Sequence, residues 1–207
     1  MKVLIADDHA IVRKGLGQLL LDEYPASLIT EVTNSQEVFE KTAKETWDLI
    51  LLDISMPGRN GIDTLKQLRS IGVKTPILIL SMHPEDQYAV RVLKAGASGY
   101  INKESAPEEL LLAVQRVLSG RKYITAEIAE KLAQSLGDEK KQPHELLSDR
   151  ELHVLQRIAA GKTVSEIAEE LSLSVNTIST YRTRILDKLS LKNSAELTRF
   201  AIDNGLV

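Results

Sequence analysis

The first 119 residues alternate between short apolar runs and longer stretches with helical spacing. The short runs are rich in Val, Ile and Leu, which is typical of strands that are buried on both faces of a parallel sheet. They occupy residues 3–6, 28–32, 49–52, 77–80 and 99–101. Because strand and helix signals alternate, the pattern predicts a doubly wound five-stranded parallel sheet with helices on both faces, an α/β fold of flavodoxin-like type.

The stretches between the runs carry apolar residues three or four positions apart, so each predicts a helix with one side against the sheet. The apolar sides are Val12, Leu16, Leu19 and Leu20; Ile62, Leu65 and Leu68; and Leu110, Leu111, Val114 and Leu118. Ser105 is followed three positions later by Glu108, which predicts a capping box at the start of the last of these helices. Gly120 predicts the end of the same helix, because glycine is common just after the last turn of a helix.

The last 60 residues read as helix throughout. Ser148 and Thr163 are each followed three positions later by Glu, the pattern of a helix-opening capping box. Asn193, with Glu196, is expected to open the final helix. The spacing predicts a four-helix domain in which residues 163–189 form a helix-turn-helix.

These patterns divide the chain into residues 1–119, a linker at 120–147 and a helical domain at 148–207. The linker holds a short helix near residues 126–136 and then becomes polar over residues 137–143. A linker of this composition allows two domains to reorient without unfolding either.

Composition places the chain among soluble proteins of a reducing compartment, so we expect a cytoplasmic protein without membrane contact. It has 207 residues, no Cys and a net charge of −3. Asp7 and Asp8 interrupt the first apolar run at once, which excludes a signal peptide. No apolar run approaches the roughly 20 residues that a membrane span needs.

Polar side chains follow four of the predicted strands within two residues. Asp7 and Asp8 follow the first, Asp53 the third, Ser81 the fourth and Lys103 the fifth. Because ligands of open parallel sheets bind at the carboxyl ends of the strands, we expect these groups to converge. Neighbouring acids repel unless a cation neutralises them, and Mg²⁺ prefers such oxygen ligands. The sequence therefore predicts a magnesium site beside a carboxylate that can attack a phosphoryl group.

Each of these residues alone has an ordinary interpretation, because a single Asp at a strand end is usually a loop or cap residue and a single Lys is usually solvated. Their joint occurrence favours a site. One alternative is an aspartyl phosphatase of the haloacid-dehalogenase type with Asp53 as nucleophile. That class places a second acid two residues later, where this chain has Ser55. The pattern therefore favours a protein that is not an enzyme of this kind.

The motif residues resemble the receiver domain of response regulators across residues 1–119. The motifs are Asp7-Asp8-His9, Asp53-Ile54-Ser55-Met56-Pro57-Gly58 with Gly61, Ser81 and Lys103. The resemblance implies that Asp53 accepts a phosphoryl group, which Lys103 and Ser81 help to hold. It also implies that Asp8, Asp53 and the Ser55 backbone carbonyl bind Mg²⁺, with Asp7 acting through a metal-bound water. Ser81 and Tyr100 would form a switch pair in which Tyr100 turns inward.

The second helix of the predicted helix-turn-helix has one apolar and one polar side. Val175, Ile178, Ile185 and Leu189 are expected to pack inward. The side chains suited to DNA phosphates and base edges are Asn176, Thr177, Ser179, Thr180, Arg182, Thr183 and Lys188. A solvated helix, or one that binds protein, remains open on spacing alone.

The helical domain resembles the LuxR-type DNA-binding domain. The matching residues are Leu147 to Glu151, Gly161-Lys162, Ile167-Ala168 and Leu173 to Ile178. With the receiver in front, the chain is similar to NarL/FixJ (LuxR-type) response regulators, and Ser179 to Arg182 is similar to their GacA/UvrY branch. Ser179 and Tyr181 stand where Lys and His are frequent, which weakens any inference of the target sequence from the family but not the inference of the fold. The resemblance implies phosphorylation by a sensor histidine kinase, binding of double-stranded DNA, and a homodimer in the phosphorylated form.

Overall fold

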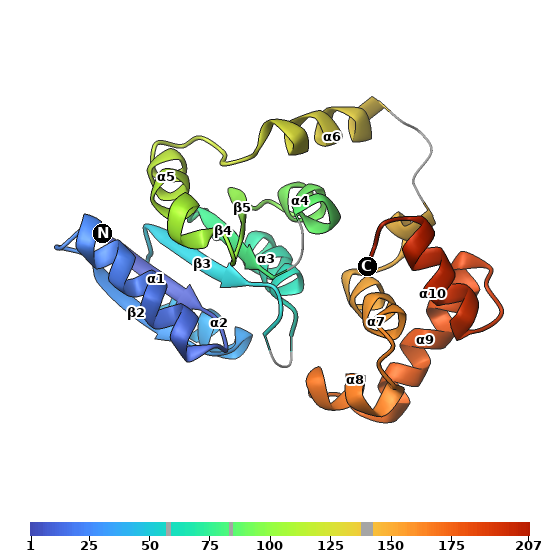
Figure 1. The fold of residues 1–207 in the computed structure, drawn as a ribbon. Coiled ribbons are helices and arrows are strands. Elements are labelled where there is room, and N and C mark those ends of the chain that lie inside the picture. The colour runs from blue at the N-terminus through green and yellow to red at the C-terminus, as the bar shows by residue number, and fades with distance from the viewer. Residues whose placement is uncertain (57–58, 83–84, 138–142) are drawn as a thin grey trace. The chain divides into compact units, whose positions relative to one another are not determined.

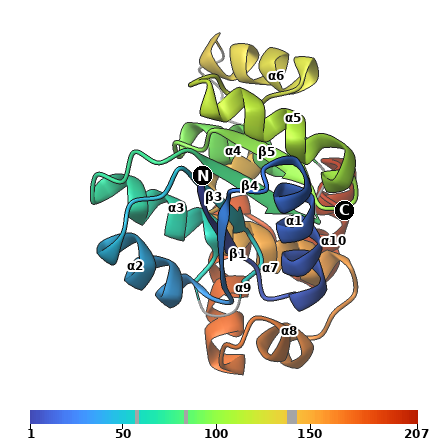
Figure 2. The same cartoon turned by 90° about the vertical axis from the view of Figure 1, so that its left-hand side faces the viewer.

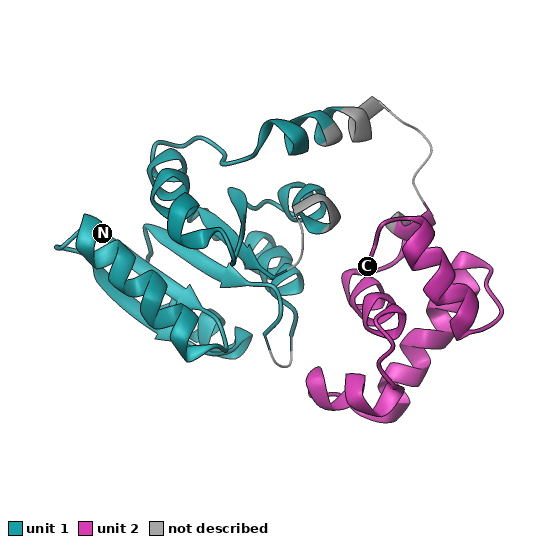
Figure 3. Cartoon of the chain, viewed as in Figure 1, with its two compact units in different colours: residues 1–136 teal, residues 137–207 magenta. Residues whose placement is uncertain are grey.

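The computed structural model describes residues 1–56, 59–82, 85–137 and 143–207. They form two compact units, Met1–Leu136 and Gly137–Val207 (Figure 3). The polar linker residues 138–142 and the motif residues Pro57 and Gly58 lie outside the described residues.

A five-stranded sheet forms the centre of the first unit (Figure 1). The strands run parallel in the order β2-β1-β3-β4-β5, so the predicted flavodoxin-like class is confirmed. Each strand lies within one residue of the predicted run. Their bounds are β1 (Lys2–Ala6), β2 (Leu28–Val32), β3 (Leu49–Asp53), β4 (Ile77–Ser81) and β5 (Gly99–Asn102).

Five helices alternate with these strands and cover both faces of the sheet. They are α1 (Ala10–Glu23), α2 (Ser35–Lys44), α3 (Gly61–Ser70), α4 (Glu85–Lys94) and α5 (Ala106–Leu118). Helices α1 and α5 lie together on one face (Figure 2), where Leu16, Leu20, Leu110 and Val114 pack against alternate residues of the strands. The predicted apolar side of α5 is wrong in one position: Leu118 is exposed, and Val117, seven residues after Leu110, is buried instead.

Helix α5 begins where the sequence predicted, but without the expected capping box. The Ser105 side chain makes no capping hydrogen bond, because its backbone is already helical with φ −95° and ψ −1°. Its hydroxyl donates instead to the Asn102 carbonyl at 3.3 Å. The end of α5 agrees with the prediction, since Gly120 has φ +79° and its N–H donates to the Val117 carbonyl.

The chain returns to the sheet after α5, inside the segment predicted as linker. Tyr123 forms an isolated parallel bridge with Gly99 at the edge of β5, and its ring belongs to the core of the first unit. The next helix, α6 (Ala126–Gly137), buries Ile128. The first unit therefore continues past residue 119, since Tyr123 and Ile128 bury apolar surface there.

The second unit is helical. Its elements are the 3₁₀ turn η1 (Pro143–Leu146) and the helices α7 (Asp149–Ala159), α8 (Val164–Glu170), α9 (Val175–Leu189) and α10 (Ser194–Asp203). Ser148 with Glu151, and Thr163 with Glu166, form the two predicted capping boxes. Asn193 caps α10 through the Glu196 N–H. Across the described ranges, no helix combines the length and apolar character needed to cross a bilayer.

Candidate functional site

The candidate receiver site lies at the point where strand order reverses, between β1 and β3. Asp7 directly follows β1, and Asp53 is the last residue of β3. The two strands pair in register, with Ala6 opposite Leu52, so both carboxylates emerge at the same sheet edge. This crevice is where open parallel sheets bind ligands.

Lys103 joins the two buried carboxylates. Its ammonium Nζ lies 2.7 Å from Asp7 Oδ2 and 3.0 Å from Asp53 Oδ2. The backbone fixes this geometry, because the Lys103 N–H donates to the Ser81 carbonyl at 2.8 Å and so ties the end of β5 to β4. The structure therefore brings together the acids and the ammonium group, as the sequence predicted.

The environment of Asp53 opposes its ionised form. Burial raises the pKa of Asp53 from 3.8 to about 6, while Lys103 lowers it and the nearby charge of Asp7 raises it again. A contact with the Ser55 backbone N–H also lowers the pKa. At neutral pH the carboxylate is still ionised and only partly compensated, which suits a group that attacks an electrophile or binds a cation.

The acidic groups fit a divalent cation. Asp7, Asp8, His9 and Asp53 each place one ligand atom within 4.8 Å of the others. Lys103 supplies one positive charge against three carboxylates. Lys103 reaches Asp53 Oδ2, whereas none of the described side chains donates a hydrogen bond to the buried Asp53 Oδ1. A hard dication would balance the remaining charge and bind the Asp53 Oδ1 oxygen.

Gly61 allows α3 to begin directly behind the site. A Cβ atom at this position would lie 2.1 Å from the Asp53 carbonyl oxygen, so no other residue fits without moving the strand end. The Gly61 N–H donates to the Ile54 carbonyl at 2.9 Å. This explains the glycine eight residues after Asp53 in the receiver motif as a close backbone approach.

The predicted switch pair is buried. Ser81 ends β4 with no exposed surface, and Tyr100 in β5 is 2% exposed. Tyr100 is paired in register with Ile79, two residues before Ser81, so both side chains project from neighbouring strands. The Tyr100 side chain is therefore buried in this structure.

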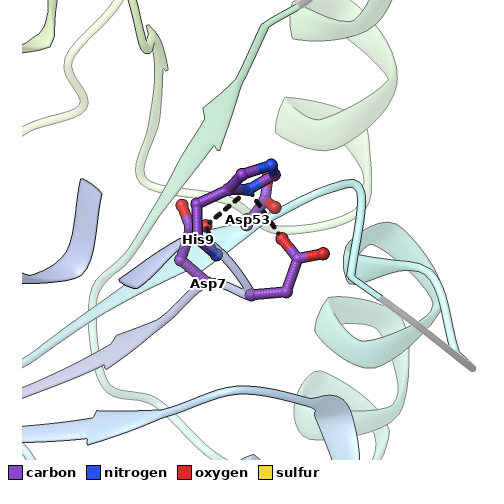
Figure 4. A group of neighbouring side chains, drawn as sticks. Asp7, His9 and Asp53 are labelled. Atoms are coloured by element: carbon purple, nitrogen blue, oxygen red, sulfur yellow. Dashed lines mark hydrogen bonds and ion pairs between the residues drawn. The ribbon is translucent and has the colours of Figure 1, made fainter. Parts of the chain in front are cut away.

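Two residues at the β1–α1 junction had no predicted role. The His9 ring lies on the same side of the strand end as Asp7 and Asp53 (Figure 4). Arg13 donates from a terminal guanidinium nitrogen to the Asp7 carbonyl at 2.7 Å, and from Nε to Glu31 at 3.1 Å. His9 directly follows Asp7 and Asp8 in the sequence, and Arg13 lies one helical turn after His9. This spacing could have predicted that both side chains lie near the acidic site.

Helices α8 and α9 of the second unit are joined by the four residues 171–174, among which Ser172 has φ +53°. Ile178 and Ile185 pack inward as predicted, but Val175 is exposed because it is the first residue of α9, beyond the inner face of the helix. The exposed polar side chains on the opposite face are Asn176, Ser179, Thr180 and Thr183, with Thr177 half-buried. This face combines short hydrogen-bonding side chains in the way that base and phosphate contacts require.

Two basic residues predicted on this face make contacts within the unit. The Lys188 ammonium lies 2.6 Å from Glu151 Oε2, on α7, and Arg182 Nε donates to Ser194 Oγ at 2.9 Å, on α10. Arg184 is exposed on α9 and was not among the predicted contacts. Lys188 and Arg182 therefore both join α9 to neighbouring helices of the same unit.

Two protein-family models match this chain, one in each of its two compact units. Residues 3–115 match the model described as the response regulator receiver domain, and residues 145–201 match the bacterial regulatory proteins of the luxR family. The chain therefore belongs to the response regulators, in the group that joins a receiver to a LuxR-type domain.

Relatives along the whole chain place it in the NarL/FixJ family. It is 35% identical over 208 residues to the response regulator UvrY of Escherichia coli K12, covering all of this chain and 95% of UvrY. It is 37% identical over 216 residues to the oxygen regulatory protein NreC of Staphylococcus epidermidis RP62A, covering all of this chain and 99% of NreC. UvrY agrees with the expected branch, but NreC is equally similar.

Solved structures give the same architecture. RcsB of Salmonella enterica serovar Typhimurium, bound to promoter rprA in the presence of the phosphomimetic BeF₃⁻, matches with a TM-score of 0.64 and 27% identity. The match covers 97% of this chain and 98% of the RcsB chain. A second RcsB–DNA complex matches with a TM-score of 0.56, again at 27% identity.

Proposed function

We propose that Asp53 is the phosphoacceptor of a receiver that controls DNA binding by the second unit. The observation that carries the proposal is the buried Asp53 carboxylate at the end of β3, 3.0 Å from Lys103. A carboxylate oxygen of Asp53 attacks phosphorus in a phosphohistidine of a sensor histidine kinase or in a small acyl phosphate. A P–O bond to Asp53 forms as the bond to the donor breaks, and the leaving group keeps the electron pair.

The carboxylates of Asp8 and Asp53 and the Ser55 carbonyl would hold Mg²⁺, with Asp7 reaching it through water. When bound, the ion supplies positive charge for the oxygens of the transferring group. Lys103 binds a phosphoryl oxygen with its ammonium group, and the Ser81 hydroxyl donates to another. Both side chains lie at neighbouring strand ends, so they can hold the group without rearrangement of the sheet.

The added charge biases a switch made of Ser81, Tyr100 and the adjoining loops. We assign residues 1–119 to the receiver, residues 120–147 to the connection and residues 148–207 to the output domain. The first part of the connection packs on the receiver through Tyr123. The exposed polar face of α9 contacts double-stranded DNA, as the RcsB–DNA complexes support. The phosphorylated form is a homodimer that regulates transcription in the cytoplasm.

Labelling of the full-length protein tests the acceptor. Acetyl phosphate with Mg²⁺ should add one phosphoryl group, detected by intact mass and localised to Asp53 by peptide mapping. Asp53→Asn should abolish the label. Asp22→Asn is the matched control because Asp22 is exposed on α1 and bonded to Gln18. Undiminished labelling of Asp53→Asn would overturn the assignment.

DNA binding has its own test. A mobility-shift assay at two salt concentrations should show affinity that falls steeply as salt rises, because contacts to phosphates release counterions. Thr180→Glu should weaken binding, since it places a negative charge on the exposed face of α9. Glu169→Gln, an exposed change on α8, is a control for an altered surface charge. Absence of any shift at low salt would favour a protein-binding domain.

A further inference from the structure

His9 occupies an unusual place at the mouth of the acidic site. It is the N-cap residue of α1, with φ −86° and ψ 107°, yet its side chain makes no capping hydrogen bond. Its backbone N–H donates to Asp7 Oδ1 at 2.8 Å, which fixes the residue beside the carboxylates. The ring is therefore held at the site by the backbone while 62% of the side chain stays exposed.

The ring nitrogen Nδ1 faces two acids at once. It lies 3.2 Å from Asp7 Oδ1 and 2.8 Å from Asp8 Oδ1. In an octahedral site with bonds of about 2.1 Å, neighbouring ligand atoms lie roughly 3.0 Å apart. The separations of 2.8 Å to Asp8 and 3.2 Å to Asp7 lie on either side of that distance, so His9 Nδ1 and Asp8 Oδ1 can be neighbouring ligands of one cation.

The group contains an imidazole as well as carboxylates, so its ligand types differ from those of a purely carboxylate magnesium site. Three carboxylates suit hard cations such as Mg²⁺, whereas an imidazole nitrogen favours later transition metals such as Co²⁺ and Ni²⁺. Asp53 Oδ1 is buried and receives no hydrogen bond from any described side chain, so a fourth ligand atom is available within the same 4.8 Å cluster.

We propose that His9 Nδ1 is a direct ligand at this site and gives it a preference for imidazole-binding divalent cations over Mg²⁺. This inference rests on the proposed metal site of the receiver and adds a ligand to it. The competing use of the same contacts is a hydrogen bond from His9 to Asp7 and Asp8, in which the ring supports the carboxylates without touching the ion.

Metal titration of the full-length protein separates these uses. Affinities for Co²⁺ and Mg²⁺ are measured by calorimetry for the wild type, for His9→Gln, which retains a hydrogen-bond donor, and for His144→Gln, a matched control in the second unit. His9→Gln should weaken Co²⁺ binding by about tenfold or more and Mg²⁺ binding much less. His144→Gln should change neither affinity. Equal losses for both ions would overturn direct ligation.

Spectroscopy of the Co²⁺-loaded protein gives a readout that a supporting role would not change. A coordinated imidazole should show a paramagnetically shifted, solvent-exchangeable N–H proton signal that His9→Gln removes and His144→Gln retains. Persistence of that signal in His9→Gln would overturn the proposal. Phosphorylation of Asp53 with Mg²⁺ distinguishes the two levels of inference. If Asp53 is labelled while Co²⁺ binding is indifferent to His9, only the ligand role fails; if Asp53 is never labelled and Mg²⁺ does not bind, the site itself fails.

Discussion

The Tyr123 hydroxyl donates a hydrogen bond to Glu109 Oε2 across 2.9 Å and so joins the segment after α5 to α5 itself. The Tyr123 N–H donates to the Ser98 carbonyl at 2.8 Å, and the ring is 8% exposed within the core. Two bonds and a buried ring thus fasten the beginning of the interdomain connection to the edge of the receiver sheet. Tyr123 therefore joins the segment that leads to α6 to both β5 and α5.

Tyr123→Phe should lower the free energy of unfolding of the receiver by about 1 kcal/mol, because a part-buried acceptor loses its donor while packing is retained. Trp47, the only Trp in the chain, is buried in the first unit, so its fluorescence during urea unfolding reports this change. Glu109→Gln keeps an acceptor oxygen and is the control. An equal loss in both variants would mean that charge on Glu109, rather than the Tyr123 hydroxyl, stabilises the connection.

Gly99→Ala should cost more, about 1–3 kcal/mol, because an added methyl group must displace packed backbone. A Cβ at Gly99 would lie 2.6 Å from the Tyr123 carbonyl oxygen and 2.8 Å from Leu78. Gly15→Ala is a control of opposite sign. Nothing lies within 4 Å of its added Cβ, so alanine in the middle of α1 should stabilise by about 0.5–1 kcal/mol. Urea unfolding of both variants checks the two directions.

The pKa of Asp53 predicts a pH-dependent cost of folding. Because burial raises this pKa from 3.8 to about 6, the folded state binds the proton more tightly than the unfolded state. The contribution of Asp53 to the free energy of unfolding should therefore fall as pH rises from 3.8 to 6 and then stay level. The raised pKa corresponds to on the order of 3 kcal/mol.

Asp53→Asn should remove this cost. Without divalent metal, the variant should be more stable than the wild type at pH 7, and its advantage should shrink as pH falls from 6 toward 4. Mg²⁺ should also reduce the advantage, because it binds the folded wild type preferentially. Urea unfolding followed by Trp47 fluorescence measures each condition. A wild type that loses stability on acidification relative to Asp53→Asn would contradict the sign of the pKa change.

Lys188 is expected to stabilise the second unit. Burial alone would raise the pKa of Glu151, but hydrogen bonds from Lys188 and Ser148 outweigh it, and the pKa is lowered overall. A lowered pKa means that Glu151 stabilises the fold above its unfolded value, and that this stability is lost as pH falls through the folded value. Lys188→Met should cost about 1–3 kcal/mol by leaving the carboxylate without its charged partner.

Hydrogen exchange of α7 and α9 peptides in the full-length protein measures the Lys188→Met effect, since Trp47 lies in the other unit. Arg184→Met is the matched control because Arg184 is an exposed cation on the same helix, and its loss should change stability by less than about 0.5 kcal/mol. If Lys188→Met weakened DNA binding without faster exchange, Lys188 would act on DNA alone.

A local sequence pattern predicts interactions between residues that lie a few positions apart, but not those between distant residues. The β3 run and the capping box at Ser148 depend on residues a few positions apart, and both agree with the structure. The Lys188–Glu151 ion pair joins residues 37 positions apart, so no local spacing of residues predicts it. The sequence assigns Tyr123 to the linker for the same reason: its bridge to Gly99 forms only once the sheet has folded.

The receiver site was predictable because topology alone brings successive strand ends together, so Asp7, Asp53 and Lys103 needed no knowledge of packing. The side-chain direction of His9 was not predictable, because it depends on the backbone angles at the start of α1. The predicted cap at Ser105 is wrong for a similar reason, because capping also depends on the local backbone angles. Its sequence fits the box, but its helical backbone turns the hydroxyl away from the N–H groups it would cap.

Phosphorylation of Asp53 is expected to tighten DNA binding by promoting a dimer. Two recognition helices on one duplex must meet half-sites about one helical turn, roughly 34 Å, apart. A monomer offers only one such helix, whereas a dimer makes the second contact intramolecular, so affinity rises without new contacts. Molecular mass and DNA affinity, each measured with and without beryllofluoride, test this coupling. Beryllofluoride that changes neither quantity would contradict it.

Helix α10 provides the surface test of that dimer. Leu197 and Ala201 are buried in the core of their own unit, so a polar substitution of Leu197 should unfold the unit rather than separate a dimer. Ile202 is 61% exposed on the same helix and is free to contact a second copy. Ile202→Asp should lower both the beryllofluoride-dependent mass and the DNA affinity while leaving labelling of Asp53 intact. Val207→Asp, an exposed apolar position beyond the helix, is the control, and equal effects of the two substitutions would exclude α10 as the dimer contact.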